Sequence, residues 1–157
     1  MKILKVSANN RKRVFEVRTR RQSFPFPYLK ADPAPSTSDR ITEVYIDPGL
    51  GREGFTYSLE SGAEGSIHID AVLEYNEDPS YMADLKLYEL TTEARARFES
   101  SGLSAREVAR RLNTSPTQLY RLLDPTNYSK SGRQLLSLLY VLGYDVEVEV
   151  KERKAAG

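Results

Sequence analysis

The chain has 157 residues, of which 39% are hydrophobic, and a mean hydropathy of −0.52, so its composition predicts a soluble chain of one ordinary domain or two small ones. It has no cysteine and a single histidine, His68, which excludes disulfides, thiol catalysis and a Cys/His zinc site. No apolar run approaches the roughly 20 residues that span a bilayer, and the first four residues turn polar too soon for a signal peptide, so we expect a cytoplasmic protein with no membrane partner.

Charge is unevenly distributed along the chain, although the net charge is only +1. Residues 1–30 carry +8, residues 31–90 carry −10 and residues 91–157 carry +3. This separation fits a protein with one face for nucleic acid and another face for a different partner. The alternative is a solvated surface with clusters of both signs.

The first 80 residues predict a small, mostly antiparallel β-domain. Alternating apolar and polar residues predict strands, with turn-forming residues between them, at 3–6, 14–19, 41–46, 55–59 and 66–73. Phe24–Tyr28 alternates aromatic residues with prolines, which forbids a helix or a central strand. We therefore expect an extended strap there, with its rings laid on the sheet.

From residue 81 onward the hydrophobic spacing is helical. We expect a short helix over 81–87, a second helix over 92–101, and a largely buried helix over 131–143. Residues 145–151 (DVEVEVK) alternate strictly between acidic or basic residues and valine, which predicts a terminal strand. Residues 152–157 are expected to be a tail.

Residues 104–124 (SAREVARRLNTSPTQLYRLLD) predict two short helices joined by a tight turn. Ser104 and Ser115 each open an S-x-x-E/Q capping box, which marks a helix start. Asn113 tolerates a left-handed backbone and can end the first helix. The expected inward positions are Val108, Ala109, Leu112, Leu119 and Leu122. This is the pattern of a helix-turn-helix, in which the second helix enters the DNA major groove.

Residues 92–150 resemble the Cro/CI-type (XRE) helix-turn-helix proteins, and in particular the antitoxin-associated branch. The resemblance is carried by three successive capping boxes, the third at Ser131, and by Leu142-Gly143 followed by the terminal strand. The expected fold is thus α+β: a small antiparallel β-domain over 1–80, then a four-helix lambda-repressor-like bundle with a C-terminal strand over 81–151. The resemblance implies a sequence-specific transcriptional regulator, the antitoxin-type repressor of a type II toxin–antitoxin system.

The resemblance also implies a set of DNA-binding residues. The second motif helix would present Ser115, Thr117, Gln118, Tyr120 and Arg121. The expected phosphate contacts are Arg106, Arg110, Arg111, Lys130 and Arg133. Ser115 and Gln118 are also expected to cap their helix, which shifts base reading toward Thr117, Tyr120 and Arg121. For any one arginine, a solvated helix face is the alternative.

An enzyme is the first competing interpretation. His68 and Asp70 would share one face of a strand, near Glu74, and could form a metal or acid–base site. A single histidine without a second nitrogen ligand, without a Gly-rich phosphate loop and without an activated nucleophile argues against it. We therefore expect no catalytic residues, no cofactor and no metal.

Protein partners are the second competing interpretation. The acidic β-domain could cover a basic toxin, and the helical bundle could bind a partner protein without recognising DNA. The strand over 145–151 suggests a homodimer, in which it pairs with the same strand of a second copy. It could instead join the N-terminal sheet of its own chain.

Overall fold

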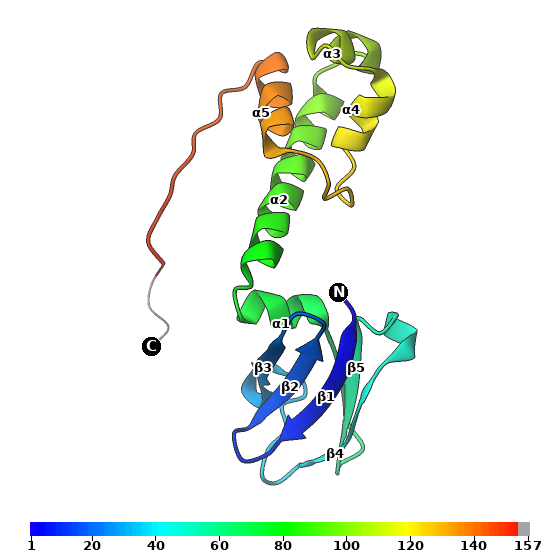
Figure 1. Ribbon diagram of the computed structural model, residues 1–157, viewed down its shortest axis with the longest axis vertical. Coiled ribbons are helices and arrows are strands. Elements are labelled where there is room, and N and C mark those ends of the chain that lie inside the picture. Colours follow the sequence, from blue (N-terminus) through cyan, green and yellow to red (C-terminus); the bar gives the residue numbers. More distant parts are fainter. Residues whose placement is uncertain (154–157) are drawn as a thin grey trace. The chain divides into compact units, whose positions relative to one another are not determined.

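The computed structural model describes residues 1–153, which form an α+β protein with six strands and five α-helices (Figure 1). The chain divides into two compact units. The first unit runs from Met1 to Met82 and the second begins at Ala83, so the boundary falls inside helix α2 (Pro79–Ser100). Within residues 1–153, no helix is both long enough and apolar enough to cross a membrane.

The first unit contains two three-stranded antiparallel sheets. One sheet has the order β1–β2–β3, from strands β1 (Ile3–Asn9), β2 (Val14–Thr19) and β3 (Ser23–Pro27). The other has the order β4–β5–β6, from strands β4 (Ile41–Ile46), β5 (Gly54–Leu59) and β6 (Glu64–His68). Two short 3₁₀ helices, η1 (Tyr28–Lys30) and η2 (Pro48–Leu50), lie in the connections. The strands predicted over 14–19 and 41–46 have the predicted bounds.

The expected aromatic strap is the edge strand β3, which pairs with β2. Phe24 and Phe26 are buried, whereas Pro25 between them is exposed. Proline has no N–H to donate to a ladder, and an edge strand is where a sheet tolerates that loss. Because the aromatic residues alternate with prolines along β3, the rings of Phe24 and Phe26 share one side of the strand and both lie in the core.

Aromatic rings form the centre of the first core. The Phe15 ring lies 4.9 Å from the ring of Tyr28 and 5.0 Å from those of Phe55 and Tyr57, measured between centroids. Helix α1 (Ile69–Tyr75) packs against β3 and β6 and completes this core (Figure 1). Its buried residues are Ile69, Val72 and Leu73.

Helix α1 corrects the strand predicted over 66–73. The strand ends at His68, whose imidazole Nδ1 accepts the backbone N–H of Asp70 at 3.2 Å and caps the helix. The apolar residues that follow are spaced three and four apart, which places them on one face of a helix rather than on one face of a strand.

The second unit packs its helices around a separate core. After α2 come α3 (Ala105–Arg111), α4 (Pro116–Leu122) and α5 (Gly132–Val141). The buried residues of this core are Ala94, Val108, Ala109, Leu119, Leu122, Leu123, Leu135, Leu138 and Leu139. Four of the five predicted inward positions are therefore buried, and Leu112 is partly buried against them.

Helix α2 corrects the prediction of two separate helices over 81–87 and 92–101. The second helix does not begin at Thr92, because α2 continues through this residue without a break. The hydroxyl of Thr91 donates to the Leu87 carbonyl at 2.6 Å, and that of Thr92 donates to the Glu89 carbonyl at 2.9 Å. Because both hydroxyls donate to carbonyls of the preceding turn, neither threonine caps the start of a new helix. Gly102, with φ +72°, follows its end.

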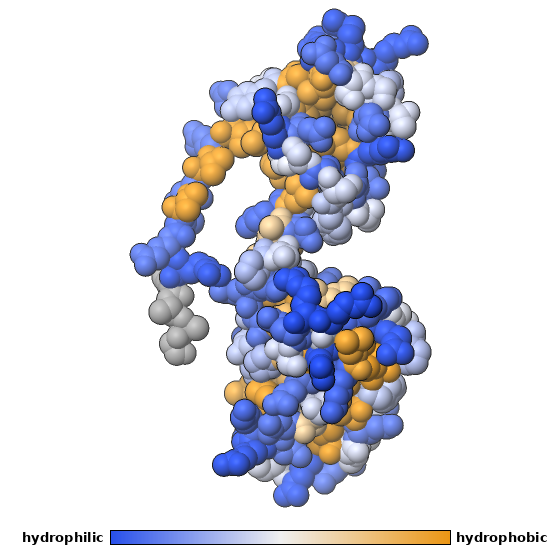
Figure 2. Space-filling model, in the orientation of Figure 1, coloured by the Kyte–Doolittle hydropathy of each residue, from blue (hydrophilic) through white to orange (hydrophobic). Residues whose placement is uncertain are grey.

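The predicted C-terminal strand over 145–151 is absent. Residues 145–151 form no backbone–backbone hydrogen bond with any residue in 1–153. Apolar and charged residues alternate along the segment after α5 (Figure 2), where Val148 and Val150 are 79% and 91% exposed. Alternation favours a strand only where another strand offers its edge, and within the described residues the second unit contains no strand.

The predicted architecture is therefore wrong in its second half. A β-domain followed by a four-helix bundle and a terminal strand is replaced by two sheets with their own helix α1, then α2 to α5, with no strand after them as far as residue 153. Of the tail predicted over 152–157, the first two residues are irregular, and 154–157 lie outside the described residues.

Candidate nucleic-acid interface

Helix α3 begins and ends on side-chain and backbone signals that are local in the sequence. The Ser104 hydroxyl accepts the N–H of Glu107 at 3.1 Å and caps the start of the helix. At the other end Asn113 has φ +55°, its N–H donates to the Arg110 carbonyl at 3.1 Å, and the next N–H donates to the Ala109 carbonyl at 2.9 Å. This pair of bonds around a left-handed residue is a Schellman ending. It makes the tight turn into α4, as predicted for Asn113.

Helix α4 starts with Pro116, and the Ser115 hydroxyl accepts the backbone N–H of Gln118 at 3.2 Å. The side chain of Gln118 does not return a bond to Ser115 or to any other residue in 1–153. The expectation that capping would occupy Gln118 is therefore wrong. Only its backbone is used, and its side-chain amide is available to a ligand.

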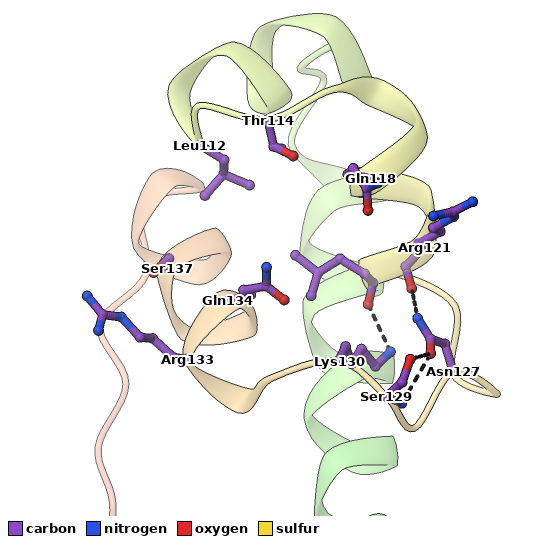
Figure 3. A pocket seen from close by; sticks show the side chains of 11 residues that line it. Leu112, Thr114, Gln118, Arg121, Asn127, Ser129, Lys130, Arg133, Gln134 and Ser137 are labelled. Carbon is purple, nitrogen blue, oxygen red and sulfur yellow. Dashed lines mark hydrogen bonds between the residues drawn. The ribbon is translucent and has the colours of Figure 1, made fainter.

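The exposed side of α4 borders a hollow of about 470 Å³, which we call the α4–α5 hollow (Figure 3). Leu119 and Leu122 are buried in the core, so Gln118 and Arg121, three residues apart, face the same side of the helix. The full lining is Leu112, Thr114, Gln118, Arg121, Leu122, Asn127, Ser129, Lys130, Arg133, Gln134 and Ser137. Figure 3 shows the amides of Gln118 and Gln134 within the hollow and the guanidinium groups of Arg121 and Arg133 extending outward at its rim.

The loop between α4 and α5 closes one side of the hollow and is fixed by internal hydrogen bonds (Figure 3). The Lys130 ammonium donates to the carbonyls of Leu122 and Asp124, at 2.8 and 2.6 Å. The Asn127 amide donates to the Arg121 carbonyl at 3.1 Å. Partial burial lowers the pKa of Lys130, and the nearby Asp124 opposes that shift. Lys130 therefore holds the end of α4, where a cation complements the helix dipole, and two of the three donors of its ammonium are already used.

The arginines of α3 are partnered differently from those of α4. Arg110 binds the Glu107 carboxylate through two nitrogens, at 2.7 and 3.1 Å, and Arg111 binds it at 3.0 Å. These hydrogen bonds lower the pKa of Glu107 to about 2. Arg106 is exposed and makes no ion pair within residues 1–153. Two of the three predicted phosphate contacts on α3 thus already have an anionic partner.

The other predicted residues of α4 lie outside the α4–α5 hollow. Tyr120 is 60% exposed and lines a separate hollow of about 210 Å³ together with Phe98 at the end of α2. Thr117 is exposed, and the Ser115 hydroxyl is already used as a cap. Of the ten predicted residues, the α4–α5 hollow brings together Gln118, Arg121, Lys130 and Arg133.

Sequence reasoning missed the remaining polar lining, which is Thr114, Asn127, Ser129, Gln134 and Ser137. The sequence pattern assigns Gln134 only to the capping box that Ser131 opens. Its helical spacing of three from Ser137 could have placed both side chains on the same exposed face of α5. No local signal connects Asn127 with α4, because their contact depends on the course of the loop.

The predicted grouping of His68 and Asp70 on one strand face does not form, because Asp70 and Glu74 lie in helix α1. The imidazole caps α1, and its nearest carboxylates are Asp70 at 3.5 Å and Glu53 at 4.0 Å. In the part of the chain that the structure describes, no group of three or more acidic or histidine side chains could hold a metal ion.

Comparisons of the chain with protein-family models, with curated proteins and with solved structures give no match.

Proposed function

We propose that the second unit binds double-stranded DNA through α4 and that the protein is a sequence-specific transcriptional regulator. The observation that carries this proposal is the pair Gln118 and Arg121. Both side chains lie on one exposed side of a helix that follows a tight turn, and neither has a hydrogen-bond or ionic partner in residues 1–153. The arrangement suits a helix that reads base edges in the major groove.

The two side chains differ in what they can recognise. A glutamine amide can donate to and accept from adenine at the same time, and an arginine guanidinium can donate twice to guanine. Arg133 at the rim of the hollow and Arg106 on α3 are suited to phosphate contacts, which fix orientation without reading sequence. The proposal thus assigns base reading to Gln118 and Arg121 and backbone binding to Arg106 and Arg133.

The test is a selection of duplex DNA from a random pool by the full chain, followed by anisotropy titrations at two salt concentrations. We expect an enriched sequence that binds at least about 10³-fold more tightly than random duplex. We also expect the affinity to fall with salt with a logarithmic slope of about −2 to −3, as for two or three released phosphates. A pool that enriches no sequence contradicts the proposal and favours the alternative, a helical unit that binds a protein partner.

An antitoxin-type repressor is the finer form of the proposal, and the outward face of the second sheet supports it. Glu43, Ser58 and Glu64 stand side by side in the register of β4, β5 and β6, with no basic residue in that row. An acidic sheet face is complementary to a basic toxin. Co-expression with the product of the neighbouring gene tests this role, and failure to co-purify a small basic partner contradicts it.

A homodimer is part of the same proposal, and the segment after α5 supports it. Val148 and Val150 are exposed, and the backbone of residues 145–151 is unpaired within the described residues, so the same segment of a second copy could supply the missing strand edge. Truncation after Tyr144 is expected to convert a dimer to a monomer in sedimentation experiments. A truncated chain that still dimerises would contradict this pairing.

A further inference from the structure

The first unit contains a small hollow that the proposed DNA contacts do not use. It has a volume of about 180 Å³ and lies between the turn after β1 and the loop before β4. Its lining is Asn10, Arg13, Tyr28, Pro35, Ser36, Thr37, Arg40 and Ile41. The lining therefore contains two guanidinium groups, three hydroxyl side chains and no carboxylate. We call it the Arg13–Arg40 pocket.

Neither arginine of this pocket has an ionic partner within residues 1–153. The nearest acid in sequence, Asp39, is already used: its two oxygens accept the N–H and the hydroxyl of Ser61, at 2.9 and 2.7 Å. By contrast, Arg21 in the same unit lies 3.4 Å from the carboxylate of Asp78. Glu60 accepts the backbone N–H of Arg40 at 3.4 Å, but neither guanidinium of the pocket is neutralised by an ion pair within residues 1–153.

One wall of the pocket is fixed by hydrogen bonds to a core residue, and the other by hydrogen bonds within its own loop. On one wall, buried Tyr28 donates its hydroxyl to the Asn10 side chain at 2.8 Å and its N–H to the Arg13 carbonyl at 3.0 Å. On the other wall, Ser36 and Asp39 exchange two backbone hydrogen bonds, at 3.0 and 3.3 Å. The pocket therefore exists before any ligand arrives, which lowers the entropic cost of binding.

Arg13 also adopts an unusual backbone conformation, with φ +57°. Glycine and asparagine occupy this left-handed region more easily than a long side chain does. Strained residues concentrate at ligand sites, where the side chain serves a purpose that the backbone alone does not require. An arginine at this position of the turn is explained if its guanidinium is needed in the pocket.

We infer that the Arg13–Arg40 pocket binds a phosphate group. Guanidinium groups match the geometry of phosphate oxygens and donate charge-assisted hydrogen bonds to them, and the hydroxyls of Ser36 and Thr37 line the same space. The pocket is smaller than the roughly 300–1,000 Å³ that holds a drug-sized ligand. It therefore takes the phosphate group alone, either from a small phosphorylated molecule or from a nucleic-acid backbone.

The test is an NMR titration of the full chain with inorganic phosphate at constant ionic strength, with chloride as the reference anion. We expect saturable shifts confined to the amides of residues 10–13 and 36–40. Arg13→Gly and Arg40→Gln should each weaken phosphate binding about tenfold or more. Glycine suits the backbone at position 13, so Arg13→Gly is expected to leave the fold intact.

Arg11→Gln is the matched control, because Arg11 is exposed on the same turn and does not line the pocket. It should change phosphate affinity less than twofold. If phosphate causes no saturable shift near the pocket, or if Arg11→Gln weakens binding as much as Arg13→Gly does, the inference is overturned, since only a diffuse positive field would remain.

A second arm identifies the source of the phosphate by measuring the DNA affinity of the two pocket variants. Loss of phosphate binding with unchanged DNA affinity indicates a small phosphorylated molecule, and parallel loss of both indicates the nucleic-acid backbone. The inference is independent of the proposed function, because Arg121→Ala should weaken binding of the selected DNA sequence and leave phosphate binding in the first unit unchanged.

Discussion

Helices α3 and α4 both carry arginines, but only two of them, both on α3, have an ionic partner on their own helix within the described residues. Arg110 and Arg111 share the carboxylate of Glu107, whereas Arg121 on α4 has no ionic partner in the described residues. The number of arginines in a motif therefore overstates the positive charge that a DNA backbone can reach. What matters is which cations the protein has left unpaired.

The difference follows from helical spacing. Glu107 precedes its two arginines by three and four residues, which are the separations that bring side chains together on a helix. The residues three and four before Arg121 are Gln118 and Thr117, and neither carries a charge. The sequence of α4 thus keeps its cation free, while that of α3 neutralises part of its own charge.

Removing the packing beneath α4 should have the largest effect. Leu119 is fully buried on the inner side of this helix, so Leu119→Ala should lower the free energy of unfolding by about 2–5 kcal/mol. Chemical denaturation followed by circular dichroism measures the loss. Thr117→Ala on the exposed side is the control and should stay within about 0.5 kcal/mol of the parent chain. Equal losses would mean that α4 does not depend on this core.

Removing the free arginine of α4 should have the next largest effect. Arg121→Ala is expected to cost about 1–3 kcal/mol in binding the selected DNA sequence and to relax specificity at one base position. Arg110→Ala should cost less, because Glu107 already occupies its guanidinium. Anisotropy titrations of both variants against the same duplex make the comparison. Equal costs would contradict the distinction between paired and free arginines.

Local signals predicted the starts and ends of several elements and much of the second core. Ser104, Ser115 and Ser131 each accept the expected backbone N–H, and Asn113 and Gly143 adopt left-handed conformations where helices end. These features depend only on residues within four positions of one another. The spacing of apolar residues is equally local, and it predicted the buried side of α3 and α4.

The errors concern features that depend on more distant parts of the chain. A strand needs a partner edge, and the alternating segment after α5 finds none among the described residues of its unit. The continuity of α2 depends on Thr91 and Thr92 bonding backward, which a capping rule does not predict. The α4–α5 hollow depends on how Lys130 and Asn127 fold a loop against the end of α4.

The same comparison can be tested by removing the acidic partner of the paired arginines on α3. Glu107→Gln removes the shared carboxylate, so Arg110 and Arg111 become available to phosphates. We expect affinity for random duplex to rise and the logarithmic salt slope to become steeper by about 1 to 2, since each added phosphate contact contributes about 0.9. Specificity should not improve, because phosphate contacts carry no sequence information. An unchanged slope would show that α3 lies away from the DNA.

A pH series should have the smallest effect. Hydrogen bonds from Arg110 and Arg111 lower the pKa of Glu107 to about 2 from its usual 4.5, so the carboxylate stays ionised throughout the range from pH 8 to pH 5. A lowered acidic pKa stabilises the folded state above the unfolded value, and this contribution is lost only as the pH falls through 4.5 toward 2. The salt slope of the parent chain should therefore be the same at pH 8 and pH 5. The Glu107→Gln chain, which cannot titrate at this position, should keep its steeper slope at both values. A parent slope that steepens toward that of the variant by pH 5 would mean that the carboxylate is protonated there and that the pairing is weaker than its geometry indicates.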